Sequence, residues 1–210
     1  MSAQHDDIIE AEVNGPQVVE EQGGLVLAAE VLPAGLPIVP LRPRPAFPAM
    51  LVPLVVNDPR QMEAVKRAVD SPARAVGLVL VRDNDAPDGP DNLHRVGVAG
   101  KIVKVLHADD DSIQFLVNTL ERFSVEEVSE ADDGLFARVR YHYGTELSVN
   151  PELKAYSMAV LATLKELIQI NPLYSEELKL FLNRSSLDDP GKLADFAANL
   201  TSADGQELQQ

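Results

Sequence analysis

The fold is decided by residues 95–106, RVGVAGKIVKVL, and by the run at 113–120, IQFLVNTL, that follows them. Both runs are rich in β-branched and other apolar residues, and the acids at 109–111 between them are typical of a hairpin turn. Gly97 and Gly100 predict a bend or a bulge, because glycine weakens a regular strand. Two strands joined by a short turn pair in the antiparallel sense, so this stretch predicts the centre of an antiparallel sheet.

Further strands are predicted on both sides of this centre. Residues 123–128 predict another strand, and the turn after it is indicated by Asp132-Asp133-Gly134. In residues 137–143 apolar or aromatic side chains alternate with basic ones, which is the period of two expected of a half-buried strand. Short apolar runs upstream predict three more strands, at residues 36–42, 50–56 and 76–81.

One helix is predicted inside this strand-rich region. Asp58 is a residue type favoured as an N-cap, and Pro59 suits the first helical position. The apolar residues that follow share one helical face: Met62, Val65 and Val69. The helix should end before Ser71-Pro72, because a residue that precedes proline disfavours helical backbone.

After Asn150-Pro151 the pattern becomes helical. Apolar residues recur at steps of three and four: Leu153, Tyr156, Val160, Leu164, Leu167 and Ile168. Later helices are predicted to open at 175–177, at Asp189-Pro190 and, cut short, at 202–204.

These patterns divide the chain into three parts. Residues 1–34 contain acids but no Lys or Arg, and they predict a disordered, mobile tail, with a partner-docking peptide as the alternative. Residues 35–148 predict a β-domain. Residues 149–210 predict a helical subdomain that is incomplete at its C-terminus.

Charge and composition narrow the classes of function. The chain has 18 Lys and Arg against 33 Asp and Glu, so its net charge of −15 repels phosphate backbones and argues against nucleic-acid binding. No apolar run approaches the roughly 20 residues of a membrane helix, and the first residues are acidic where a secretion signal is basic. The chain has no cysteine, which excludes disulfides and thiolate metal sites. Because the sequence shows neither a membrane helix nor a secretion signal, we expect a cytoplasmic protein.

Motifs of catalysis are missing from the sequence. The glycines at 97–102 and Gly191-Lys192-Leu193 come nearest to a phosphate-binding loop, but neither has its spacing or its hydroxyl. No two histidines stand four residues apart as in a helical zinc site. Ser157 and Lys165 are about two helical turns apart, too far for a nucleophile and its base. We therefore expect no catalytic, cofactor or metal site.

The acidic segment at 83–89, DNDAPDG, invites comparison with a calcium loop. An EF-hand has a ligand at the fifth position and glycine at the sixth, where this chain has Pro87 and Asp88. The flanking segments are predicted strands and not helices. We interpret this segment as an acidic surface loop.

A family resemblance begins at residues 36–42, LPIVPLR, and continues at 47–54, FPAMLVPL. These stretches resemble the opening of the N-terminal domain of Lon ATP-dependent proteases, whose pattern is L-P-x-x-P-L-R followed by F-P-x-M-x-x-P-L. Other stretches similar to the family extend the resemblance to about residues 36–210: 96–102, 120–123, 174–177 and 189–195. The first loop departs from the family at Pro43-Arg44-Pro45, where an acid and apolar residues are usual, and at Ala49, where histidine is common.

The resemblance implies an α+β chain, in which an N-terminal antiparallel PUA-like β-pseudobarrel with one early helix precedes a truncated C-terminal α-helical bundle. It also implies a function: recognition of substrates and support of assembly for an ATP-dependent Lon serine protease, which degrades misfolded and regulatory proteins. The partners implied are unfolded or tagged proteins and the remainder of Lon in a homo-hexamer. ATP and magnesium belong to a downstream domain that this chain lacks.

Recognition of unfolded proteins needs exposed apolar surface or an open strand edge. We place the candidate substrate contacts on the first loop and the strand rim: Arg42, Phe47, Met50, Leu51 and Arg122. The alternatives are that Phe47, Met50 and Leu51 belong to the core and that Arg122 pairs with an acid.

Three other functions stay open at this point. The first is a stand-alone LON-domain module that binds proteins without belonging to a protease. The second is a hydrolase whose motif is unfamiliar. The third is an RNA-binding barrel, which the net charge of −15 opposes.

Overall fold

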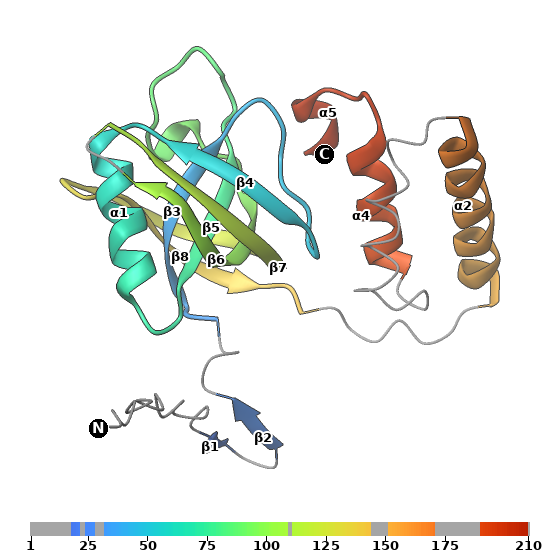
Figure 1. Ribbon diagram of the computed structural model, residues 1–210, viewed down its shortest axis with the longest axis horizontal. Coiled ribbons are helices and arrows are strands. Elements are labelled where there is room, and N and C mark those ends of the chain that lie inside the picture. Colours follow the sequence, from blue (N-terminus) through green and yellow to red (C-terminus); the bar gives the residue numbers. More distant parts are fainter. Residues whose placement is uncertain are drawn as a thin grey trace, which may run out of the picture. The chain divides into compact units, whose positions relative to one another are not determined.

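The computed structural model describes residues 18–21, 24–27, 32–108, 111–143, 151–170 and 190–209 (Figure 1). The chain divides into two units, Met1–Val31 and Leu32–Gln210. In the first unit, β1 (Val18–Glu21) pairs antiparallel with β2 (Gly24–Leu27), a hairpin that the sequence analysis did not foresee. The rest of the predicted tail up to residue 31 lies outside the described residues, so its mobility stays a prediction.

The second unit is a mostly β domain with few helices. Its elements follow in this order: β3 (Gly35–Leu41), β4 (Leu51–Val56), α1 (Pro59–Asp70), β5 (Ala75–Leu80), a 3-10 turn (Pro90–Asn92), β6 (Val96–Ala108), β7 (Ile113–Ala131), β8 (Gly134–Tyr141), α2 (Pro151–Ile170), α4 (Pro190–Leu200) and α5 (Gly205–Leu208). The strands and helices predicted within the described ranges are present, with small differences at the ends, except that the two strands predicted at 113–120 and 123–128 form one strand, β7. The helix predicted at 175–177 lies outside the described residues.

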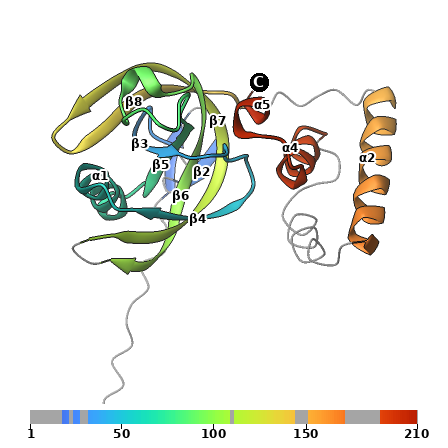
Figure 2. The same ribbon diagram turned by 90° about the horizontal axis from the view of Figure 1, so that it is seen from above.

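Six strands form one sheet, in the order β4-β7-β6-β5-β3-β8. Because β8 also pairs with β7, five of these strands form a closed circuit of pairings (Figure 2). All pairs are antiparallel except β3 with β5, so the prediction of a purely antiparallel sheet is wrong at this pair. The reason is the connection: the chain leaves β3, forms β4 and α1, and returns beside β3 in the same direction, which a hairpin cannot do.

Strand β7 is the longest element of the sheet, with 19 residues. The sequence analysis predicted two strands here, 113–120 and 123–128, because the polar pair Glu121-Arg122 interrupts the apolar pattern. Backbone pairing continues across that pair, since β6 bonds to β7 as far as Ser124. The bulge predicted near Gly97 and Gly100 is confirmed, because the register shifts between Ala99 and Gly100.

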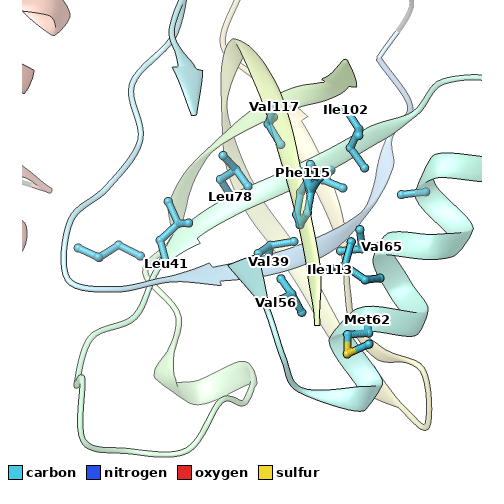
Figure 3. Close-up of a cluster of buried hydrophobic side chains, with 13 residues drawn as sticks. Val39, Leu41, Val56, Met62, Val65, Leu78, Ile102, Ile113, Phe115 and Val117 are labelled. Carbon is cyan, nitrogen blue, oxygen red and sulfur yellow. The ribbon is translucent and has the colours of Figure 1, made fainter. Parts of the chain in front are cut away.

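Helix α1 closes one end of the sheet. Its N-cap is Asp58, whose carboxylate accepts hydrogen bonds from the backbone amides of Arg60 and Gln61, each at 3.0 Å. Figure 3 shows Met62 and Val65 of this helix beside Ile113 of β7. They belong to one core cluster with these buried side chains: Val39, Leu41, Val56, Ala68, Val76, Leu78, Leu80, Ile102, Phe115 and Val117. The cap and the apolar face therefore fix α1 as predicted.

A second core cluster fills the other part of the circuit, around Phe123 and Ala99. Gly97 allows the strands to approach each other here, because a Cβ at this position would lie 2.6 Å from the carbonyl oxygen of Leu78. Tyr141 packs edge-on against Phe123 and donates a hydrogen bond to the carbonyl of Pro33 at 2.6 Å. Burial, with a smaller contribution from Tyr143, raises the pKa of Tyr141 well above its ordinary value, so the hydroxyl remains a donor.

The helices after the sheet form a small cluster of their own. Helix α2 packs on α4 through Leu164, Leu193 and Phe196. Helix α5 begins after Asp204, whose carboxylate accepts from the amide of Glu207 at 2.8 Å, so the helix start predicted at 202–204 is confirmed. None of the helices in the described ranges combines the length and apolar character needed to cross a membrane.

We predict that Asp58→Ala lowers the free energy of unfolding by about 0.5–2 kcal/mol, because two amides at the start of α1 lose their acceptor. Urea denaturation followed by circular dichroism measures the change. Asp58→Asn is the control, since it keeps the acceptor without the charge and should cost much less. Equal losses for the two variants would show that the cap does not stabilise α1.

Candidate functional site

Arg42, the first of the predicted contact residues, is engaged within the fold. Its Nε donates to the carbonyl of Asn84 at 3.2 Å, and its Nη2 donates to the carbonyl of Ala86 at 3.1 Å. The same Nη2 lies 2.6 Å from a carboxylate oxygen of Asp88. These contacts fasten the acidic loop at 83–89 to the end of β3. Arg42 therefore supports the loop and offers few free donors to a ligand.

The loop before β4 is held by a buried threonine that the sequence analysis missed. The hydroxyl of Thr119 donates to the carbonyl of Phe47 at 2.7 Å and accepts from the amide of Met50 at 2.8 Å. The backbone of Thr119 adds two bonds, from its amide to Met50 and from the amide of Ala49 to its carbonyl. Phe47 itself is buried, so the core alternative holds for this residue. Met50 is half-buried.

A groove of about 590 Å³ opens next to this loop. Its lining comes from the loop, β4, β6, β7 and α4: Ala49, Leu51, Val103, Leu116, Asn118, Thr119, Leu120, Glu121 and Lys192. Leu51 and Val103 are 43% and 49% exposed, which leaves large apolar side chains open to water. An exposed apolar surface framed by polar groups is typical of a binding site for other proteins. Of the five predicted contacts, only Leu51 lies in this groove.

Arg122 forms a two-bond ion pair with Asp195 of α4. Nη1 of Arg122 donates to Oδ2 of Asp195 at 2.9 Å, and Nη2 donates to Oδ1. The side chain of Asp195 is only 10% exposed, whereas that of Arg122 is 40% exposed. Such bidentate pairs are among the stronger hydrogen-bonded contacts in proteins. The interpretation that Arg122 pairs with an acid is therefore confirmed, and the pair joins β7 to the helical part.

A second arginine holds the C-terminal end of α4. Nη2 of Arg44 donates to the carbonyl of Thr201 at 3.0 Å and to that of Asn199 at 3.4 Å. The last carbonyls of a helix lack partners inside the helix and carry partial negative charge. Arg44 therefore caps α4 from the loop that also carries Phe47.

Two residues with structural roles at this site escaped the sequence analysis, although each left a signal. Ile113, Phe115 and Val117 alternate toward the core, and the next inward position is a threonine, Thr119. Asp195 is an acid on the apolar face of its helix, between the buried residues Leu193 and Phe196. A polar residue at a position that periodicity assigns to the interior requires a hydrogen-bond partner. The pattern shows the need for a partner but not which residue supplies it.

Metal binding would need several His, Asp or Glu side chains close together in the described ranges. Nowhere in them do three or more His, Asp or Glu side chains gather in a way that could hold a metal ion. Nε2 of His94 lies 2.8 Å from Oε1 of Gln206, and Nε2 of His142 lies 2.7 Å from the hydroxyl of Ser124. Each of these histidines thus has a hydrogen-bond partner.

We predict that Thr119→Val destabilises the domain by about 1–3 kcal/mol, because the amide of Met50 and the carbonyl of Phe47 lose a buried partner. Urea denaturation measures the loss, and hydrogen exchange should show faster exchange at the amide of Met50. Thr119→Ser keeps the hydroxyl and serves as the control. If valine and serine behave alike, the hydroxyl does not hold the loop.

We further predict that Arg122→Ala costs more stability than Asp195→Ala. The first variant leaves a buried carboxylate unpaired and should cost roughly 2 kcal/mol or more, whereas the second leaves an arginine that can turn to water. Hydrogen exchange of the α4 amides measures the effect locally. Arg138→Ala, which breaks exposed pairs with Glu126 and Glu127, should change stability by less than about 1 kcal/mol. The reverse order of the first two variants would contradict this assignment.

The fold and the groove define a small β-domain that presents apolar surface beside a firmly held loop. Residues 35–210 match the family described as the ATP-dependent protease La (LON) substrate-binding domain. The chain belongs to this family of LON substrate-binding domains.

Two curated relatives show how much of a longer protein the chain matches. It is 62% identical over 209 residues to Lon protease 1 of Syntrophotalea carbinolica, covering 97% of this chain and 26% of that protein. It is 37% identical over 194 residues to the Lon protease of Chlamydia pneumoniae, covering 91% of this chain and 23% of the relative. The chain thus spans about a quarter of the length of these relatives.

Solved structures share the fold. The N-terminal domain of the Mycobacterium avium complex Lon protease aligns with a TM-score of 0.62 at 19% identity, covering 84% of this chain and 90% of that one. The Lon N-terminal domain protein from Xanthomonas campestris aligns with a TM-score of 0.57 at 16% identity, with the same coverage of 84% and 90%. At such low identity the likeness shows the fold alone, a mostly β domain with few helices.

Proposed function

We propose that this chain binds protein substrates on behalf of an ATP-dependent Lon-type serine protease and performs no catalysis itself. The observation that carries the proposal is the open apolar groove beside Leu51 on a domain of the LON substrate-binding family. The proposed substrates are unfolded, tagged or regulatory proteins. Peptide cleavage and ATP hydrolysis, with their ATP and magnesium, are assigned to parts of such a protease outside this chain.

The chemistry of the groove suits an unfolded chain better than a folded one. Unfolded proteins expose apolar side chains, and burying one leucine-sized side chain contributes about 1.5–3 kcal/mol. Millimolar affinity already requires about 4 kcal/mol, so one inserted side chain gives only weak binding. Six copies in the proposed hexamer would raise the effective concentration of such a site and convert weak contacts into useful retention.

The five candidate residues divide into two roles under this proposal. Leu51 contacts the substrate directly, and half-buried Met50 borders it. The other three residues support the fold and do not contact the substrate. Arg42 holds the acidic loop, Phe47 packs in the core and Arg122 holds α4. The net charge of −15 favours apolar or basic substrate segments and disfavours nucleic acid and anionic membranes.

The finer architecture belongs to the same proposal. We assign the closed circuit of β3, β5, β6, β7 and β8 to a PUA-like pseudobarrel over residues 35–148. We assign α2, α4 and α5 to the beginning of a helical bundle over residues 149–210. We also propose that the protein is located in the cytoplasm. These assignments are supported by the strand pairings and by the packing of α2 on α4.

Attachment to a protease is favoured over a stand-alone binding module. The two curated relatives described above are Lon proteases, and they match the chain over 97% and 91% of its length. A hydrolase has no comparable support, and the net charge of −15 opposes an RNA-binding barrel.

We predict that Leu51→Asp or Val103→Asp weakens binding of a permanently unfolded, dye-labelled model protein by about five- to tenfold, which is about 1–1.4 kcal/mol. The acid places a charge in the apolar groove, and fluorescence anisotropy measures the dissociation constant. Val55→Asp is the matched control, because Val55 is exposed on the same strand but does not line the groove. If all three variants bind the probe equally weakly, or if none of them loses affinity, the groove is not the binding site.

A further inference from the structure

Residues 204–209, here named the strap, lie against the β-domain. The side-chain amide of Gln206 donates from Nε2 to the carbonyls of Val81 and Arg82, at 3.1 and 3.0 Å. Because this nitrogen faces two acceptors, Oε1 of Gln206 must accept from Nε2 of His94 at 2.8 Å, and His94 carries its hydrogen on Nε2. One glutamine thus uses both ends of its amide to dock the strap.

Two more contacts hold the strap along its length. Nε2 of Gln209 donates to the carbonyl of Val96 at 3.2 Å. At Gly205 a Cβ would lie 1.9 Å from the carbonyl oxygen of Pro43, so only glycine permits this approach of the two backbones. The strap therefore packs closely against the loop at Gly205, and side-chain amides anchor it near both of its ends, at Gln206 and at Gln209.

The strap borders an apolar cleft of about 250 Å³, which is separate from the groove beside Leu51. The cleft is lined by the loop, by β5, β6 and β7 and by the strap itself, and its lining includes Phe47, Leu78, Val96, Val98, Arg122 and Leu208. Leu208 is half-buried there. Leu208 thus forms one wall of the cleft, and it comes from a segment whose side-chain amides bond to the backbone carbonyls of Val81, Arg82 and Val96.

An unfolded protein offers the same two groups, apolar side chains and free backbone amides. We propose that the strap is an internal competitor, whose Leu208 covers one side of a cleft that an apolar side chain of an unfolded substrate enters once the strap is displaced. This inference rests on the proposed function and adds a second, self-covered contact site to it.

The anchoring chemistry suits a segment that detaches without unfolding the domain. The strap is held mainly by a few side-chain amides, and Gln206 is exposed, so water can replace its bonds. Helix α4 has separate attachments, through Arg122 and Arg44, and keeps its place when the strap leaves.

The test uses the whole 210-residue chain and reduced, carboxymethylated α-lactalbumin, labelled with a dye, as the unfolded probe. The double variant Gln206→Ala/Gln209→Ala releases the strap, and Leu208→Ala removes the competing side chain while keeping the anchors. We expect each to bind the probe about three- to tenfold more tightly than the unchanged chain. Glu207→Gln, an exposed change within the strap, should leave binding unaltered.

A second arm needs no variant of the strap. Adding the unlabelled probe to the unchanged chain should speed hydrogen exchange at the amides of residues 204–209 and leave α1 unaffected. Unaltered or weaker binding by both strap variants, or unaltered exchange in the strap, would show that the strap is only a brace. If the unchanged chain and all variants fail to bind the probe, the proposed function itself is overturned.

Discussion

Backbone pairing along β7 is the constraint on which the rest of this domain depends. The strand bonds to β4 and β6 in its first part and to β8 in its last part, so one continuous ladder ties together both core clusters. A strand of 19 residues needs bends to pair with such different neighbours. Register shifts supply them on β7, between Thr119 and Glu121 opposite β6 and between Val125 and Glu127 opposite β8. Without this strand, β4 would have no partner and the circuit would be open.

The same strand also positions the candidate binding surface. Leu116 and Leu120 line the groove, Thr119 holds the loop beside it, and Arg122 fixes α4 at its far side. Residues 116–122 of β7 therefore line the groove, hold the loop beside it and join the β-domain to α4. A rigid groove loses little conformational entropy on binding, which makes a weak apolar contact more effective.

Groove and strap illustrate two ways of presenting apolar surface to water. Leu51 and Val103 remain exposed in the groove, beside the loop that Thr119 holds. The cleft beside Phe47 is partly covered by Leu208 of the same chain, held through exchangeable hydrogen bonds. An uncovered surface is always available but invites aggregation, whereas a covered one opens only when a competitor binds.

The sequence by itself determined the local elements: the cap and face of α1, the buried strand β5, the bulge near Gly100, and the change from strands to helices near residue 150. These follow from periodicity and turn chemistry, which act over a few residues. Only the tertiary structure decided the parallel pairing of β3 with β5, the continuity of β7 through Glu121-Arg122, and the partners of Thr119 and Asp195. Asp195 lies 73 positions from Arg122, and no local pattern encodes which distant group satisfies a buried charge.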